Sequence, residues 1–421
     1  MPPGKRGEVD EGARPDVEGD RISALPDVLL SHVLSLLPAE EAVRTCVLAR
    51  RWRHLWKSAP ALRIGHLHKH KPKSVGALRK FVDHLLLLRG GLSLNKFELR
   101  LGGFSGPDDV PRVNLWLRQA VMCKIRVLKL YLHHNNAYID PWLELDDLPL
   151  VSKYLTRLQL RGVRCHASFL NFSSCPALEQ IEFEYCNVSS AQKISSEYLK
   201  CLSITDSVFG EDSRIRICAP NLVSLHLDDP WFYTPILESM PGLAKAFVRI
   251  AEQCHDSCSK LWDPHQHCDC QYCNSSDNIG DGADNCMLLK GLSEAKSLVL
   301  ISDLDLVYLH PTSFIFKSDL RWCPTFKKLK TMLLNEYWCV PDLQALTCIL
   351  EHSPNLEKLT LQLFSKGPKH KVEMNGSFSS MERSVGISEH LKIVEVKCEV
   401  IDERVLKVLQ FLCTFSIRFS F

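Results

Sequence analysis

The stretch LTRLQLRGVRCHASFLNFSSCPALEQIEFEYCNVSSAQKISSEYLKCLSITDSVFGEDSRIRICAPNLVSLHL, residues 155–227, decides the fold of this chain. It holds one pattern, L-x-x-L-x-L with conservative changes, four times, beginning at Leu155, Leu178, Leu199 and Leu222. Successive copies start 23, 21 and 23 residues apart. One unit of this length cannot bury its own leucines, whereas stacked units share a core. The stretch therefore predicts a repeat architecture.

The same pattern continues on both sides of this stretch with looser spacing. Further copies start at Leu94, Ile125, Leu329, Leu356 and Leu391. The central spacing falls in the range of about 20–29 residues that is typical of leucine-rich repeats. The predicted fold class is therefore α/β, with a leucine-rich-repeat solenoid over residues 91–396. Its parallel β-sheet is expected to line a curved horseshoe.

In each repeat, the residue between the last two apolar positions faces away from the core. Such residues line the concave face, where repeat proteins bind their partners. The alternative for any single one is an ordinary solvated strand position. The substrate-binding candidates on this face are Gln159, Glu182, Ser203, His226 and Thr360. The expected partner here is a protein substrate of unknown identity.

The repeat register is lost between Leu227 and Leu298, and residues 251–287 form a polar insertion rich in cysteine and histidine. Thiolates and imidazoles are ligands of structural zinc. The weak metal candidates are Cys254, Cys258, Cys270 and Cys273. Their spacing matches no zinc module, so a loop without metal is favoured and no cofactor is expected. Nothing fixes a base beside these cysteines, so no catalytic role is expected either.

A second informative stretch, RISALPDVLLSHVLSLLPAEEAVRTCVLARRWRHLWKS, covers residues 21–58. Pro26 favours the start of a helix that runs to about Leu37, and Pro38 ends it. A second helix is expected over residues 40–49. Apolar residues cover more than one side of the first helix. A segment of about forty residues is too small to bury so much apolar surface alone, so it packs on the chain or binds a partner.

This stretch resembles the F-box of plant proteins in the order of its leucine, proline, valine and tryptophan residues, with Cys46 where the family often has serine. The resemblance implies a three-helix domain over residues 20–62 that binds a Skp-type adaptor and, through it, a cullin scaffold. The residues it places on or behind the adaptor-binding surface are Leu25, Pro26, Leu29, Val33, Leu34, Leu37, Pro38, Val43 and Trp52. A helical hairpin that merely caps the solenoid is the alternative.

The C-terminal stretch SEHLKIVEVKCEVIDERVLKVLQFL, residues 388–412, predicts a strand followed by an amphipathic helix. It resembles the opening of the FBD domain that follows the repeats in many plant F-box proteins. The family's domain is longer, so we expect a truncated FBD, such as an alternatively spliced product, with a divergent tail over 413–421. Residues 1–19 are expected to be a disordered leader, and residues 63–90 a linker and first helix.

Composition and missing motifs exclude several classes of function. A net charge of +2 predicts no large electrostatic field, so nucleic acid is not an expected partner. No stretch has the apolar length of a signal peptide or a membrane span, so no membrane association is expected. The expected location is intracellular, in the nucleus and/or cytoplasm, with mostly reduced cysteines. No phosphate-binding glycine loop or nucleophile elbow is present, so an enzyme is not expected.

These features together predict a plant F-box/leucine-rich-repeat protein of the F-box/FBD/LRR type. Its expected role is that of a non-catalytic substrate-recognition subunit in an SCF-type cullin-RING ubiquitin ligase. The alternative is a repeat scaffold that binds a partner protein without a role in ubiquitination. Binding to a Skp-type adaptor distinguishes the two hypotheses.

Overall fold

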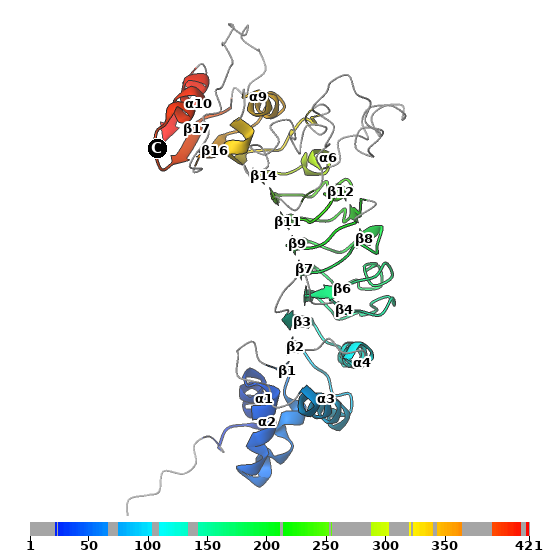
Figure 1. Ribbon diagram of the computed structural model, residues 1–421. Helices are drawn as coiled ribbons and strands as arrows, with labels where there is room; N and C mark the ends of the chain where they lie inside the picture. The colour runs from blue at the N-terminus through cyan, green and yellow to red at the C-terminus, as the bar shows by residue number, and fades with distance from the viewer. Residues whose placement is uncertain are drawn as a thin grey trace, which may run out of the picture.

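A long parallel β-sheet is the main feature of the computed structural model, which places helices at both ends of it (Figure 1). The model describes residues 22, 24–65, 75–102, 109–133, 142–210, 214–251, 254, 288–302, 320, 323–339, 343–363, 390–413 and 418–420. Within these residues the predicted α/β class is confirmed: N-terminal helices lead into a solenoid of parallel strands.

The N-terminal helices begin where the prolines predict. Helix α1 (Asp27–Leu36) follows Pro26, and helix α2 (Ala39–Arg44) follows Pro38. The rest of the bundle consists of 3-10 turns: η1 (Thr45–Val47), η2 (Arg50–Arg53) and η3 (Leu55–Ser58). The second α-helix is thus shorter than expected: from Thr45 the chain continues as the 3-10 turn η1, and at Ala49 it is extended, with φ −157°.

The main sheet contains thirteen strands among the described residues, and each pairs in parallel with its neighbours. In order they are β1 (Ala61–Ile64), β2 (Lys96–Gly102), β3 (Val127–His133), β5 (Arg157–Arg161), β7 (Gln180–Glu184), β9 (Cys201–Thr205), β11 (Ser224–Asp228), β13 (Lys245–Ile250), β14 (Ser297–Ser302), β15 (Thr331–Asn335), β16 (Lys358–Leu363), β17 (Ile393–Cys398) and β18 (Arg418–Ser420). This order is the chain order, as a solenoid requires.

The register of the sheet stacks the apolar residues of successive repeats. Leu158 on β5 pairs with Leu128 on β3 and with Ile181 on β7, and all three are buried. Along each central strand, buried residues alternate with more exposed ones, as the period of two predicts. One continuous core therefore runs through the repeats.

The convex side of the sheet carries helices near its ends and short strands in the middle (Figure 1). The helices are α3 (Val75–Arg89), α4 (Asp109–Met122), α6 (Leu289–Leu292), α9 (Gln344–Glu351) and α10 (Glu403–Cys413), with the 3-10 turn η5 (Glu336–Cys339). The short strands are β4 (Leu143–Glu144), β6 (Val163–Arg164), β8 (Lys193–Ser195), β10 (Arg216–Cys218) and β12 (Ile236–Leu237). The central repeats of 21–23 residues leave too few residues for a helix.

The residue after each central strand adopts the left-handed conformation. These residues are Gly162, Tyr185, Asp206 and Asp229, with φ between 45° and 74°. Each donates its backbone N–H to a carbonyl oxygen at the end of the next strand, over 2.8–3.1 Å. Left-handed backbone is unfavourable for residues other than glycine, so the repeated hydrogen bond offsets the strain in every turn.

The prediction that the repeat register is lost between Leu227 and Leu298 is wrong. Strand β13 pairs along its whole length with β14 and continues the ladder from β11. The small Ala246 occupies the position that leucine or isoleucine holds in most repeats, and so the pattern was not recognised.

The sheet also extends beyond the predicted solenoid limits of residues 91 and 396. Strand β1 follows the helical bundle almost immediately, and β18 lies in the segment expected to be a divergent tail. The strand and helix expected over residues 388–412 are present as β17 and α10. The leader and residues 255–287 lie outside the described residues.

Among the residues that the structure describes, no helix combines the length and apolar character needed to cross a bilayer.

Candidate functional site

Helix α1 is apolar on two sides, and the described residues of the chain cover only one of them. Leu30 and Leu34 are buried in the common core of the bundle and the first strand. Val28, Leu29 and Val33 instead expose 79%, 51% and 46% of their surface. Large apolar side chains gathered on the surface mark an interaction site more often than scattered ones do. The uncovered side of α1 is therefore a candidate docking surface.

Three further apolar side chains of the bundle are largely exposed. Leu36 lies at the end of α1, and Val47 and Leu48 follow α2. Hereafter the exposed apolar set of the bundle comprises Val28, Leu29, Val33, Leu36, Val47 and Leu48. This set falls within only 21 consecutive residues of the sequence.

Hydrogen bonds fix the bundle that carries this set. Arg51 donates from Nε to Oδ1 of Asp27 over 2.8 Å and from Nη2 to the carbonyl oxygen of Leu25 over 2.6 Å. The hydroxyls of Ser31 and Ser58 lie 2.9 Å apart and join α1 to η3. The start and middle of α1 are thereby held in place, and a preorganised surface binds without first having to order itself.

A buried arginine joins the bundle to the solenoid. Arg89, at the end of α3, donates to the carbonyl oxygens of Ala59 over 3.0 Å, Ser93 over 3.3 Å and Trp56 over 3.4 Å. Burial lowers the pKa of this guanidinium from its ordinary value. Three carbonyl partners compensate for the desolvation of the charge, and buried polar groups need such partners.

The predicted adaptor-binding residues divide by exposure. Pro26, Leu29 and Val33 are exposed, whereas Leu34 and Trp52 are buried and shape the bundle from inside. The half-buried members are Leu25, Leu37, Pro38 and Val43. Their role in adaptor binding remains a prediction.

Val28 and Leu36 were missing from the predicted set, although the helical period contained the signal. At about 100° per residue, Val28, Leu29, Val33 and Leu36 fall within about 140° of one another around the axis of α1. The buried Leu30 and Leu34 fall on the opposite side. A helical wheel would therefore have separated the two sides.

The concave face contains the predicted substrate-binding residues in one row. The register aligns Glu98, Lys129, Gln159, Glu182, Ser203, His226, Phe247, Val299, Leu333, Thr360 and Glu395 across successive strands. This row is hereafter called the concave row.

Charged and polar groups pair with one another at the N-terminal end of the concave row. Glu98 accepts from Lys96 over 2.5 Å and also pairs with Arg100. Burial by itself raises the pKa of Glu98, but these two cations bring it below its ordinary value. Tyr131 donates to Gln159 over 3.0 Å, and Gln159 in turn donates to Glu182. This part of the face is a preorganised polar network.

The concave row becomes apolar further along. The ring of His226 stacks on Phe247, with centroids 4.4 Å apart and planes 14° apart. Burial lowers the pKa of His226, although Asp228 opposes the shift, so neutral imidazole is favoured. Val299 and Leu333 continue the row and are half-buried. A bound partner would therefore meet charge at one end and apolar surface in the middle.

The five substrate-binding candidates differ in accessibility. Glu182, Ser203 and His226 are half-buried, whereas Gln159 and Thr360 are 5% and 6% exposed. Thr360 donates to Glu395 over 3.3 Å. Phe247 and Val299 are absent from the predicted set, because the sequences of β13 and β14 depart from the repeat pattern. The binding role of all five candidates remains a prediction.

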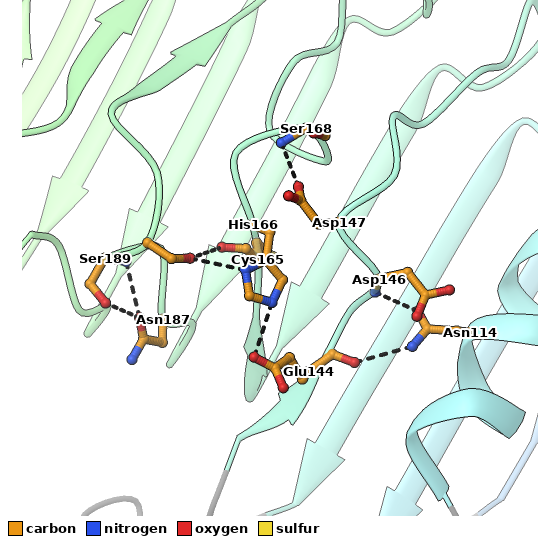
Figure 2. A network of polar contacts seen from close by, with 10 residues as sticks. Asn114, Glu144, Asp146, Asp147, Cys165, His166, Ser168, Asn187 and Ser189 are labelled. Atoms are coloured by element: carbon orange, nitrogen blue, oxygen red, sulfur yellow. Dashed lines mark hydrogen bonds and ion pairs between the residues drawn. The ribbon is translucent and has the colours of Figure 1, made fainter.

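A polar network on the convex side includes a serine, a histidine and a carboxylate (Figure 2). His166 lies 3.0 Å from Glu144 through Nε2 and 3.4 Å from the Ser190 hydroxyl through Nδ1. The same hydroxyl donates to the carbonyl oxygen of Cys165 over 3.1 Å. These residue types also form hydrolytic triads, but here the serine closes a backbone turn.

The neighbours of this network have the same structural role (Figure 2). Asn114 donates to the carbonyl oxygen of Glu144 over 3.1 Å and accepts from the backbone of Asp146 over 3.0 Å. Asp147 accepts from the backbone of Ser168 over 2.8 Å. We therefore assign the network to the packing of successive convex turns.

Of the metal candidates in the insertion, only Cys254 is described. It is 4% exposed, belongs to the core cluster and forms a parallel bridge with Phe232. Cys258, Cys270 and Cys273 lie outside the described residues.

The fold and the exposed apolar set define a class of protein: a helical bundle with an uncovered apolar side, followed by a solenoid of parallel strands. The family model of the F-box domain matches residues 22–63. Two F-box/FBD/LRR-repeat proteins of Arabidopsis thaliana are each 26% identical to this chain. The alignments cover 89% and 95% of the chain and 85% and 91% of those proteins.

An F-box/LRR-repeat protein of the same plant is 28% identical over 82% of this chain and 93% of its own length. The chain thus carries an F-box domain and is similar over most of its length to plant F-box/LRR-repeat proteins, as its sequence predicted. An F-box implies a general ability to bind a Skp-type adaptor, and F-box/LRR proteins generally act as non-catalytic substrate adaptors.

Proposed function

We propose that this protein is the substrate-recognition subunit of an SCF-type cullin-RING ubiquitin ligase. In this role the F-box binds a Skp-type adaptor, the adaptor links it to a cullin, and the concave row holds a target protein. A conjugating enzyme on the scaffold performs the chemistry. The receptor contributes proximity, since it keeps a target lysine near an activated thioester.

The observation that carries this proposal is the exposed apolar set of the bundle. These side chains stay uncovered although the bundle packs closely on the solenoid. Burying a valine or leucine side chain that is half-exposed stabilises a complex by about 1 kcal/mol. Several such residues on one small bundle favour a permanent partner with its own apolar surface.

The junction between the bundle and the solenoid supports a bridging role. Strand β1 starts three residues after η3 ends, and β1 is already part of the main sheet. Arg63 on β1 donates back to the carbonyl oxygen of Leu36 over 3.0 Å. Adaptor and target would therefore be held at a fixed distance and orientation, which effective transfer to a lysine needs.

The proposed receptor role requires no cofactor of its own, because the scaffold enzymes supply the reactive groups. The proposed location is the nucleus and/or cytoplasm, where cullin scaffolds and reduced thiols occur together. The proposed target is a protein or peptide that presents both charged and apolar groups, because the concave row offers both.

Proximity labelling of the full chain in plant cells, with the proteasome inhibited, tests this proposal. We compare the natural chain with Val33→Asp on α1 and with the control Leu115→Asp, whose residue is 55% exposed on α4. The adaptor and cullin should be labelled by the natural chain and the control but lost with Val33→Asp. Candidate targets should be labelled by all three and be ubiquitinated only where the adaptor is retained. If the natural chain labelled targets but neither adaptor nor cullin, the plain scaffold would be favoured and the proposal contradicted.

A further inference from the structure

Two cysteines and a histidine meet at the convex side of the last repeats, away from both the bundle and the concave row. Cys348 lies on α9, His352 directly follows that helix, and Cys323 lies in the segment before β15. One potential ligand atom from each, a sulfur or a ring nitrogen, lies within 4.8 Å of the other two. All three residues are half-buried.

We propose that Cys323, Cys348 and His352 form a zinc-binding site. Zinc prefers thiolate and imidazole ligands in a tetrahedral arrangement, at about 2.3 Å from sulfur and about 2.0 Å from nitrogen. Those bond lengths place the donor atoms about 3.5–3.8 Å apart. Sγ of Cys348 and Nδ1 of His352 are 4.0 Å apart. A contraction of at most about 1.3 Å in any pair of donor atoms would therefore complete the geometry.

Local structure supports the assignment, because the ligand on α9 and the ligand at its C-terminal end have the spacing of a metal-binding pair. Residues four apart in a helix lie on the same side of it, and Cys348 and His352 have this spacing. The thiol of Cys348 already points at the incoming segment, since it donates to the carbonyl oxygen of Leu320 over 3.6 Å. The backbone N–H of Phe326 donates to the carbonyl oxygen of His352 over 2.8 Å.

Zinc binding requires deprotonated ligands. A thiolate binds metal, whereas a thiol does not. As zinc binds, each coordinated thiol loses its proton to solvent. Nδ1 of His352, which donates its hydrogen to the Cys348 carbonyl oxygen over 2.8 Å, also releases that proton to solvent while Nε2 takes one up, and the neutral ring can then bind the metal through Nδ1.

The role of this zinc is structural. It joins α9 to the segment that enters β15 and so ties two successive repeats together on the convex side. The site is distinct from the cysteine candidates of the 251–287 insertion, and it depends on the fold because Cys323 and Cys348 are 25 residues apart.

Metal analysis of the full chain, purified without a metal-affinity tag, tests the proposal. The natural chain should carry about one zinc ion, as one set of three protein ligands predicts. The variants Cys348→Ser and His352→Gln should lose it. Cys398→Ser, a half-buried thiol on β17, and the double variant Cys270→Ser/Cys273→Ser serve as controls and should keep it. Zinc retained by Cys348→Ser, or lost from the double variant, would overturn the assignment.

A second measurement does not depend on any variant folding correctly. Bound zinc should slow alkylation of Cys323 and Cys348 in the natural chain, and a chelator should restore it, as peptide mass spectrometry can measure. Alkylation of Cys398 should be unaffected by the chelator. Equal alkylation with and without chelator, or a disulfide between Cys323 and Cys348 in freshly lysed cells, would contradict a zinc site.

Discussion

The F-box bundle and the central repeats contain similar apolar residues but cover them differently. On strands β5, β7, β9 and β11, the leucine, isoleucine and phenylalanine side chains lie within the described core. On the bundle, the exposed apolar set remains outside it. Each repeat has a neighbour on both sides, whereas α1 has the solenoid on one side only. In the proposed function, the adaptor would cover the second side of α1, which the described residues leave exposed.

The comparison predicts a large loss of stability for one leucine of α1 and almost none for another. Leu34→Ala should destabilise the protein by about 3 kcal/mol, because it leaves a cavity in the core. Leu29→Ala should change stability by less than about 0.5 kcal/mol, because Leu29 is already exposed. Urea unfolding measures both. Equal losses of stability in the two variants would show that Leu29 is as buried as Leu34, so that α1 has no uncovered side.

The junction between the two regions can be broken at one glycine. Gly65 has φ +81°, and a Cβ there would lie 1.9 Å from the carbonyl oxygen of Arg100. Gly65→Ala should therefore cost about 2 kcal/mol more than Gly91→Ala, whose φ is +76° but whose surroundings are open. Hydrogen exchange should also show faster opening of β1 in Gly65→Ala only. A similar loss in both variants would mean that the backbone conformation alone matters.

A smaller effect is expected in the solenoid turns, where Asp229 is held in left-handed backbone. Burial first, and then the charge of Asp206, raise its pKa from 3.8 to about 6, and its Oδ1 is buried without a hydrogen bond. The Asp229 carboxyl group therefore binds its proton more tightly in the folded state than in the unfolded state. The stability that this group contributes is complete below about pH 4 and is lost as the pH rises through about 6.

Asp229→Asn removes that titration and keeps a residue type that tolerates left-handed backbone. The variant should be more stable than the natural chain by on the order of 1 kcal/mol at pH 8, after allowance for solvent screening, and no more stable at pH 4. Urea unfolding at the two pH values checks this. A gain that is the same at both would assign the effect to something other than ionisation.

Much of the fold could be predicted because it depends on patterns that are local in the sequence, such as the spacing of apolar residues and the positions of prolines. The repeat of leucines gives strands and their stacking, and Pro26 and Pro38 give the starts of α1 and α2. Strand β13 was missed because Ala246 does not resemble the leucine at that position in most repeats. Sequence patterns identify repeats only where side chains are large.

The candidate sites were less predictable, because contacts between strands and loops decide them. Gln159 was correctly placed in the concave row, but its burial follows from Tyr131 and Glu182 on neighbouring strands. The spacing of Cys348 and His352 is visible in the sequence, yet Cys323 joins them only through the fold. Which side chains meet in such sites depends on the register between neighbouring strands and on the paths of the loops, and neither follows from composition.

The central claim is that the uncovered side of α1 docks a Skp-type adaptor, and calorimetric titration of adaptor into the full chain tests it most directly. Leu29→Asp and Val33→Asp should each weaken binding by at least about 100-fold, equivalent to about 3 kcal/mol, because each would bury an unpaired carboxylate. Leu115→Asp should bind like the natural chain. Undiminished binding by both α1 variants, or an equal loss in all three, would contradict the claim.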